Sequence, residues 1–166
     1  MKGFDVTEMD SVDGKLAAAL GYKKMYSKKD LRITESIDCN ERCIFAGNEP
    51  GILGRALRKN NIEGIIISDN ELLRQTVEEC KAHEKILFIN TSGLILQDQR
   101  QRLRNIYRAR FLMGFAMRER TKIAIISAAK DESEMLSVGQ MVALAKFLGA
   151  DENRAREMVA SIGMIS

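Results

Sequence analysis

Short, uninterrupted apolar runs recur along this chain, and they constrain its fold more than any other feature. The clearest is Ile65-Ile66-Ile67, a β-branched run between Gly64 and Ser68. Strands that are apolar on both faces are typical of parallel sheets covered by helices on each side. We therefore predict six strands, at residues 4–9, 24–27, 43–46, 65–67, 86–89 and 123–126.

Helix start and stop signals lie between these strands. Pro50 suits the first turn of a helix, and Ser68 and Ser137 each begin a capping-box spacing. Helices are predicted at residues 50–59, 68–83, 99–120, 137–149 and 151–161. The alternation of strand and helix indicates an α/β fold with right-handed crossovers. Because no linker-like segment divides the 166 residues, we expect one domain, residues 1–166.

The composition argues against several classes of protein. No run reaches eighteen apolar residues, so no membrane-spanning helix is predicted, and the first residues lack the apolar stretch of a signal peptide. Three cysteines do not form a disulfide framework, which favours a reducing, cytoplasmic location. Cys39, Cys43 and Cys80 lack the spacing of a zinc site. His83 is the single histidine, so catalysis based on histidine is not expected.

The segment from Asp98 to Lys122 carries an excess of positive charge. It holds eight basic and two acidic residues, a net charge of +6, whereas the rest of the chain has a net charge of −3. Seven of the eight cations are arginine, which binds phosphate through two donors and stacks on bases. A basic element on a mildly acidic body suggests contact with a polyanion. The plainer alternative is a solvated helix face with internal ion pairs.

A helical wheel with 100° per residue distributes these arginines around the predicted helix. Arg104 and Arg108 point away from the apolar stripe, so we expect them to be free for a partner. Arg110 points towards the middle of the stripe, where it must snorkel or meet a buried acid or a partner group. The stripe, which we expect to pack on the sheet, consists of Leu103, Ile106, Tyr107, Met113, Gly114 and Met117.

Residues after the last predicted strand suggest a contact surface. Ser127-Ala128-Ala129 would let a partner approach closely, and Lys130 could reach a phosphate. Met135, if exposed, would suit an adaptable protein interface. After the first strand, Glu8 and Asp10 would form a general acid–base pair only if they converged with a metal or another acid.

Three segments, taken in order, resemble ribonuclease P protein component 3 of archaea and its eukaryotic relative. The first two are Phe4-Asp5-Val6-Thr7-Glu8-Met9-Asp10 and Cys43-Ile44-Phe45-Ala46-Gly47-Asn48-Glu49-Pro50. The third runs from about Arg102 onward and includes the arginine-rich helix, Ile123-Ala124-Ile125-Ile126, Ser127-Ala128-Ala129, Leu148-Gly149 and Ala155-x-x-x-Val159-x-Ser161.

The resemblance implies a fold like the eight-stranded βα (TIM) barrel, related to metal-dependent phosphoesterases but without their metal site. Eight units would have only about 21 residues each here, against roughly 250 residues for a typical barrel. We therefore expect a shortened or incomplete barrel of six or more strands, with about one βα unit fewer than the family.

The resemblance also implies a function. Family members are protein subunits of ribonuclease P, the ribonucleoprotein endonuclease that removes the 5′ leader from precursor tRNA. Its RNA, with bound magnesium, performs the chemistry, and this subunit supports that RNA together with protein component 2 and other ribonuclease P proteins. We accordingly expect no catalytic residue, cofactor or metal site in this chain.

Charge and resemblance together give two sets of candidate site residues. The predicted RNA-binding residues are Arg100, Arg102, Arg104, Arg108, Arg118, Arg120, Lys122 and Lys130. The predicted partner interface consists of Arg110, Ser127 and Met135. Two alternatives remain: a small barrel phosphoesterase that binds its metal through acids such as Glu8 and Asp10, and a protein scaffold without RNA contact.

Overall fold

A computed structural model of the chain describes residues 3–27, 30–95 and 98–161. The strands are β1 (Gly3–Val6), β2 (Tyr22–Tyr26), β3 (Arg32–Thr34), β4 (Cys43–Gly47), β5 (Ile62–Ile67), β6 (Ile86–Asn90) and β7 (Ile123–Ile126). The α-helices are α1 (Gly14–Ala19), α2 (Pro50–Leu57), α3 (Arg74–Ala82), α4 (Gln99–Glu119), α5 (Val138–Leu148) and α6 (Glu152–Ala160). Short 3₁₀ helices lie at η1 (Ser68–Asn70), η2 (Ser92–Leu94) and η3 (Glu132–Glu134).

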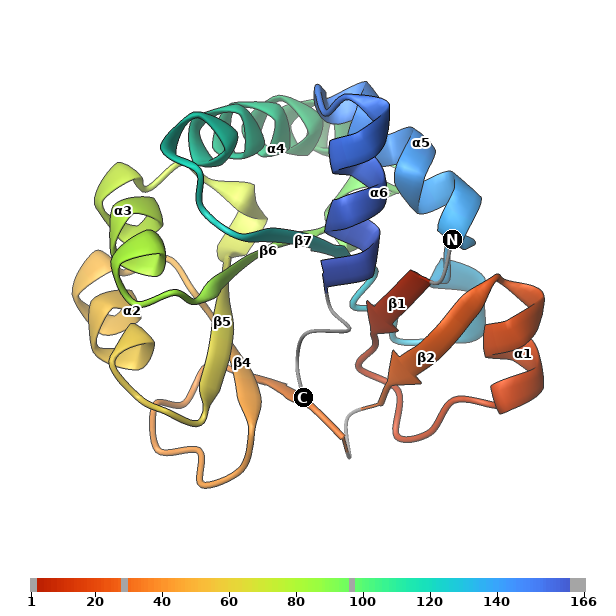
Figure 1. Cartoon of the computed structure of the whole chain (residues 1–166), viewed down its shortest axis with the longest axis horizontal. Helices are drawn as coiled ribbons and strands as arrows, with labels where there is room; N and C mark the ends of the chain where they lie inside the picture. Colours follow the sequence, from red (N-terminus) through yellow and green to blue (C-terminus); the bar gives the residue numbers. More distant parts are fainter. Residues whose placement is uncertain (1–2, 28–29, 96–97, 162–166) are drawn as a thin grey trace.

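The strands form two parallel sheets that the helices surround (Figure 1). One sheet has five strands in the order β3-β4-β5-β6-β7, and the other pairs β1 with β2. All the described strand pairs are parallel, and from β4 to β7 the strands alternate with helices, as the continuous apolar runs predict. The α/β class is confirmed, and the arrangement is that of a shortened TIM-barrel-like fold.

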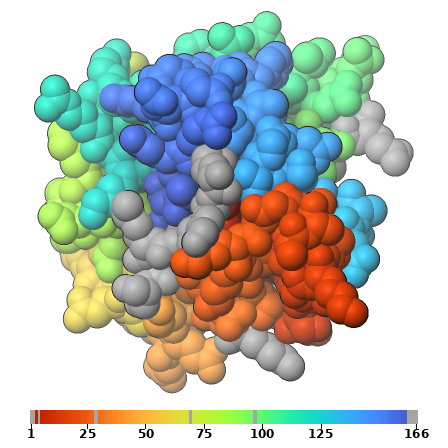
Figure 2. All heavy atoms as spheres, turned by 45° about the vertical axis from the view of Figure 1, so that its right-hand side comes forward, coloured from red at the N-terminus to blue at the C-terminus, as the bar shows by residue number. Residues whose placement is uncertain are grey.

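Beyond the end of β7, the chain joins the two sheets along a seam with β1. The amide of Ala128 donates to the carbonyl of Val6 at 3.0 Å, and the amide of Glu8 donates to the carbonyl of Ala129 at 2.9 Å. Helix α6 packs against both β7 and β1 and covers this seam from outside. In Figure 2 the N-terminal segment accordingly abuts the C-terminal helices. Between β2 and β3, the described residues form no ladder, so the barrel is incomplete.

Each strand divides its side chains between two apolar clusters. Ile66, Phe88 and Ile126 point to the inside of the barrel, together with Val6 and Tyr26. Their neighbours in sequence, such as those at positions 65, 87 and 125, pack against the helices. Because both faces are covered, the strands need apolar residues at every position, and this requirement explains the uninterrupted runs.

The described residues contain one strand more than the six that the sequence pattern predicts. Strand β3 was missed because it has only three residues, of which Ile33 alone is apolar. Helix α1 was also missed, although Asp13 caps it by accepting a hydrogen bond from the amide of Lys15. Strand β1 ends at Val6 rather than at residue 9.

The predicted helix at residues 68–83 begins later than expected. Residues Ser68–Asn70 form a 3₁₀ turn, and α3 starts at Arg74. Asn70 has a φ of 50° and exchanges hydrogen bonds with the backbone of Asn90, which holds it in a conformation that interrupts an α-helix. The predicted start and end of α5 are confirmed. Ser137 and Gln140 make a capping box at its start, and Gly149 ends the helix with a φ of 118°.

Candidate nucleic-acid interface

Helix α4 is the element on which most of the candidate residues lie. Asp98 caps it by accepting hydrogen bonds from the amides of Arg100 and Gln101, at 2.9 and 3.2 Å. The helix ends at Arg120, which takes the left-handed conformation with a φ of 61°. Between these caps, 21 residues hold the arginine side chains on one rigid rod at the outside of the barrel (Figure 1).

The face of α4 that packs on the protein is not the stripe predicted from the sequence. The buried residues of α4 are Asn105, Ala109, Leu112, Met113, Phe115 and Ala116. Of the predicted stripe, Met113 is buried, Ile106 and Met117 are half-buried, and Gly114 is exposed. The predicted orientation was therefore wrong, because the true contact face uses small alanines and an asparagine that donates to the carbonyl of Gly93 at 3.0 Å.

Two large apolar side chains of the expected stripe, Leu103 and Tyr107, lie on the outside of the molecule instead, together with Phe111. Leu103, Tyr107 and Phe111 are 50%, 62% and 68% exposed. They are four residues apart, so they form one row along the outward face. Arg110 lies on this same side and is exposed, which corrects the expectation that it points towards the sheet.

The arginine side chains of α4 differ in their exposure to solvent and in their contacts with the rest of the protein. Arg100, Arg102 and Arg104 are exposed, and Arg108 is half-buried. Arg118 is exposed but lies over the ring of Phe115, with 5.0 Å between its guanidinium carbon and the ring centroid. The first half of the helix therefore presents the most accessible guanidinium groups.

The remaining predicted RNA-binding residues lie towards the two ends of the barrel. Arg120 and Lys122 are exposed just before β7, at the amino ends of the strands. Lys130 is exposed after β7, at the opposite end, where its amide donates to Glu134 at 2.8 Å. The structure thus brings the arginines of α4 together but separates Lys122 from Lys130.

Two of the three predicted interface residues are buried. Met135 is 8% exposed and belongs to the core. Ser127 is 1% exposed, and its hydroxyl donates to Asp5 at 2.6 Å. The small-residue strand end therefore serves the seam between β7 and β1, which corrects the expectation of direct partner contact at Ser127.

Asp5 is a buried acid whose importance the sequence reasoning missed. Its carboxylate accepts hydrogen bonds from the amides of Val6 and Ser127, both at 2.8 Å, and from the Ser127 hydroxyl. Burial raises the pKa of Asp5 to about 6, although these hydrogen bonds act to lower it. An acid within an apolar strand is the sequence feature that marks Asp5. Its partner Ser127 lies 122 residues away and could not be deduced from the sequence.

A hollow of about 490 Å³ lies beside the outward row of α4. Its lining includes Tyr107, Phe111 and Arg104 from the helix, and Glu71 and Leu72 from the segment before α3. An aromatic and apolar surface flanked by arginine can contact the face of a flat ring while a cation meets an anionic group.

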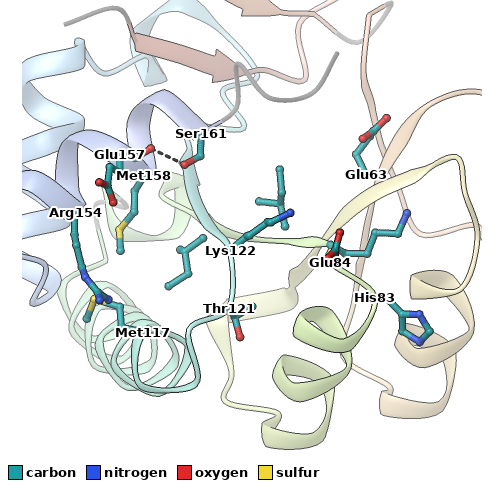
Figure 3. A pocket seen from close by; sticks show the side chains of 13 residues that line it. Glu63, His83, Glu84, Met117, Thr121, Lys122, Arg154, Glu157, Met158 and Ser161 are labelled. Carbon is teal, nitrogen blue, oxygen red and sulfur yellow. Dashed lines mark hydrogen bonds between the residues drawn. The ribbon is translucent and has the colours of Figure 1, made fainter.

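A second hollow, of about 580 Å³, opens at the amino ends of β6 and β7. Figure 3 shows Lys122 extending across it, with Glu84, Arg154 and Glu157 on other sides. Barrel enzymes place their chemistry at the opposite, carboxyl ends of the strands. The charges here are of both signs and do not converge, so this hollow is a weaker candidate site than α4.

The acids considered for a metal-dependent phosphoesterase lie just after β1. Glu8 is half-buried and Asp10 is exposed. Over residues 3–27, 30–95 and 98–161, no group of three or more His, Cys, Asp or Glu side chains is placed to hold a metal ion. No specific observation therefore favours that alternative. In the same ranges, no helix is long and apolar enough to cross a membrane.

Comparison with known proteins gives a likeness of fold. No family model matches the sequence, and no curated protein matches it. Among solved structures, the chain is similar to one chain of a cryo-EM structure of archaeal ribonuclease P with mature tRNA. The TM-score is 0.71 at 13% sequence identity, and the match covers 99% of this chain and 80% of the other. The two chains therefore share a fold.

Proposed function

We propose that this chain is a protein subunit of ribonuclease P that binds RNA through helix α4. The observation that carries the proposal is a 21-residue helix with exposed arginines, on a barrel whose fold matches a chain of an archaeal ribonuclease P. The sequence motifs point to the same family and independently favour its component 3.

The geometry suits the support of an RNA rather than chemistry by the protein. Arg100, Arg102 and Arg104 project from a capped helix, so the spacing of their Cα atoms is set before RNA binds. Arginine on phosphate releases counterions and gives affinity that falls with salt. In this proposal the cleavage of precursor tRNA is carried out by the RNA with its magnesium, in the cytoplasm. Protein component 2 and other ribonuclease P proteins complete the particle.

Reconstitution tests the proposal directly. The purified chain, combined with component 2 and the cognate ribonuclease P RNA, should raise the rate of precursor tRNA cleavage above that of the RNA with component 2 alone. The comparison is made at a salt concentration at which the particle assembles. A rate that does not rise under this condition would contradict the proposal.

The double variant Arg100→Ala and Arg104→Ala tests the role of α4. If both side chains contact phosphate, the slope of log affinity against log salt should become shallower by about 1.4 to 1.8. Arg58→Ala, which removes an exposed arginine at the end of α2, is the matched control and should leave the slope unchanged. An unchanged slope in the double variant would show that these arginines do not touch phosphate.

A further inference from the structure

The outward face of α4 is more than a basic surface. Leu103, Tyr107 and Phe111 form an exposed row among the arginines, with steps of about 6 Å along the helix axis. Exposed large apolar side chains are ordinary when scattered, but a contiguous row beside a hollow marks an interaction surface. Binding to phosphate alone would involve the arginines and would not explain why this apolar row is exposed.

The chemistry of the face restricts what can bind there. Arg100, Arg104 and Arg110 are exposed around the row, whereas Glu71 is the acid that lines the adjoining hollow, so the face favours an anionic partner. The partner must also present apolar, preferably flat, groups to Tyr107 and Phe111. Double-stranded RNA meets the first requirement but not the second, because its bases are stacked inside the helix and only their edges are displayed.

We propose that the row of Leu103, Tyr107 and Phe111 is a stacking surface for unpaired nucleotides of an RNA, with Arg100 and Arg104 on the adjacent phosphates. This inference rests on the proposed function and specifies the part of the RNA that α4 contacts: a loop, bulge or single-stranded segment. Each unpaired nucleotide supplies both a ring face and a phosphate, which is the combination that the helix presents.

An acidic, apolar protein segment is the competing occupant. It would need several carboxylates on both sides of an apolar ridge to match the arginines that flank the row. A single strand has this arrangement at every nucleotide, without any particular sequence. The charge of α4 therefore favours RNA, and protein binding becomes an outcome that the experiment detects.

Fluorescence anisotropy with three labelled ligands tests the inference. The ligands are a single-stranded RNA of about 12 nucleotides, a size typical of stacking proteins, the same backbone without bases, and a duplex of the same length. The full chain should bind the base-bearing strand more tightly than the abasic strand. Each stacked base that is lost should weaken binding by about 5-fold to 160-fold.

Tyr107→Ala and Phe111→Ala should remove the preference for the base-bearing strand and keep the salt slope of the unmodified protein. Both side chains are exposed, so the urea midpoint of each variant should be unchanged. Phe147→Ala is the matched control, because Phe147 is a 57% exposed aromatic residue on α5 and should retain the preference.

Three results would overturn the inference, and they separate it from the proposed function. Equal affinity for the base-bearing and abasic strands would leave α4 as a phosphate contact only, with the reconstituted activity intact. Loss of component 2 binding in Tyr107→Ala, without change in RNA affinity, would make the row a protein interface. Absence of any RNA binding, together with no stimulation of cleavage, would contradict both proposals.

Discussion

The two faces of helix α4 both carry large apolar residues, although only one of the faces packs on the protein. The inward face uses Ala109 and Ala116, and it also buries the polar Asn105. The outward face keeps Leu103 and Phe111 in contact with water. Leu112, Met113 and Phe115 complete the inward face, so the exposed row is an additional apolar surface and not a replacement for the buried one.

This contrast shows that apolar residues in one helix can have two separate roles. Those on the inward face contribute to the free energy of unfolding, whereas those on the outward face contribute nothing until a partner covers them. Substitutions of the same residue type on the two faces should therefore have different effects on stability and on RNA binding.

The largest expected effect on stability comes from a leucine of the inward face. Leu112 is completely buried, so Leu112→Ala should lower the free energy of unfolding by about 2 to 5 kcal/mol. Leu103→Ala, the same change on the outward face, should alter it by less than about 0.5 kcal/mol. Urea denaturation measures both, and similar losses in the two variants would refute the assignment of the faces.

The orientation of α4 shows where sequence reasoning reached its limit. The length of the helix was predicted to within a residue at each end, because its caps and composition are local features. Its contact face was predicted from Leu103, Tyr107 and Met113, since large apolar residues dominate a helical wheel. The actual face is set by the elements on which α4 packs, chiefly η1, η2 and α3, and their positions are not a property of the helical sequence.

In the rest of the fold, too, features that depend on neighbouring residues could be predicted, and contacts between residues far apart in the sequence could not. Strands β4 to β7 were predicted because burial on both faces leaves an apolar run in the sequence. The seam between β1 and β7 was not, because Asp5 and Ser127 are joined only in three dimensions. For the candidate site, composition located the basic helix, but only the structure revealed the row beside its arginines.

Buried charge at the seam gives a further contrast with the charges of α4, most of which lie in water. The pKa of Asp5 is raised to about 6 from its ordinary value of 3.8, mainly by burial. Between these values the folded protein keeps a proton that the unfolded chain has lost, so stability falls as pH rises. The loss attributable to Asp5 should be about 2 kcal/mol between pH 4 and pH 6.

Asp5→Asn should abolish this part of the pH dependence, because an amide does not ionise. The measurement is urea denaturation of both proteins at several pH values from 4 to 7. Asp30→Asn is a control whose pH dependence has the opposite sign. Hydrogen bonds from Ser27 lower the pKa of Asp30, so the contribution of Asp30 to the free energy of unfolding is lost as pH falls. Parallel pH profiles for the unmodified protein and Asp5→Asn would show that Asp5 does not titrate in this range.

The smallest expected effect separates Arg118 from the other arginines of α4. Its guanidinium carbon lies 5.0 Å from the ring centroid of Phe115, and that of Arg74 lies 5.6 Å from the same centroid. Arg118→Ala should therefore lower the free energy of unfolding by about 0.5 to 1 kcal/mol. Arg104 has no such ring contact among the described residues, so Arg104→Ala should change stability less and RNA affinity more.

A double-mutant cycle with Phe115→Leu isolates this contact, because leucine keeps the apolar side chain but removes the ring. In the Phe115→Leu background, Arg118→Ala should have little further effect on the free energy of unfolding. An undiminished effect in that background would mean that Arg118 stabilises α4 by another route, such as its charge near the carboxyl end of the helix. Arg118 would then resemble the remaining arginines, and the division of α4 into a structural and an RNA-facing set would have to exclude it.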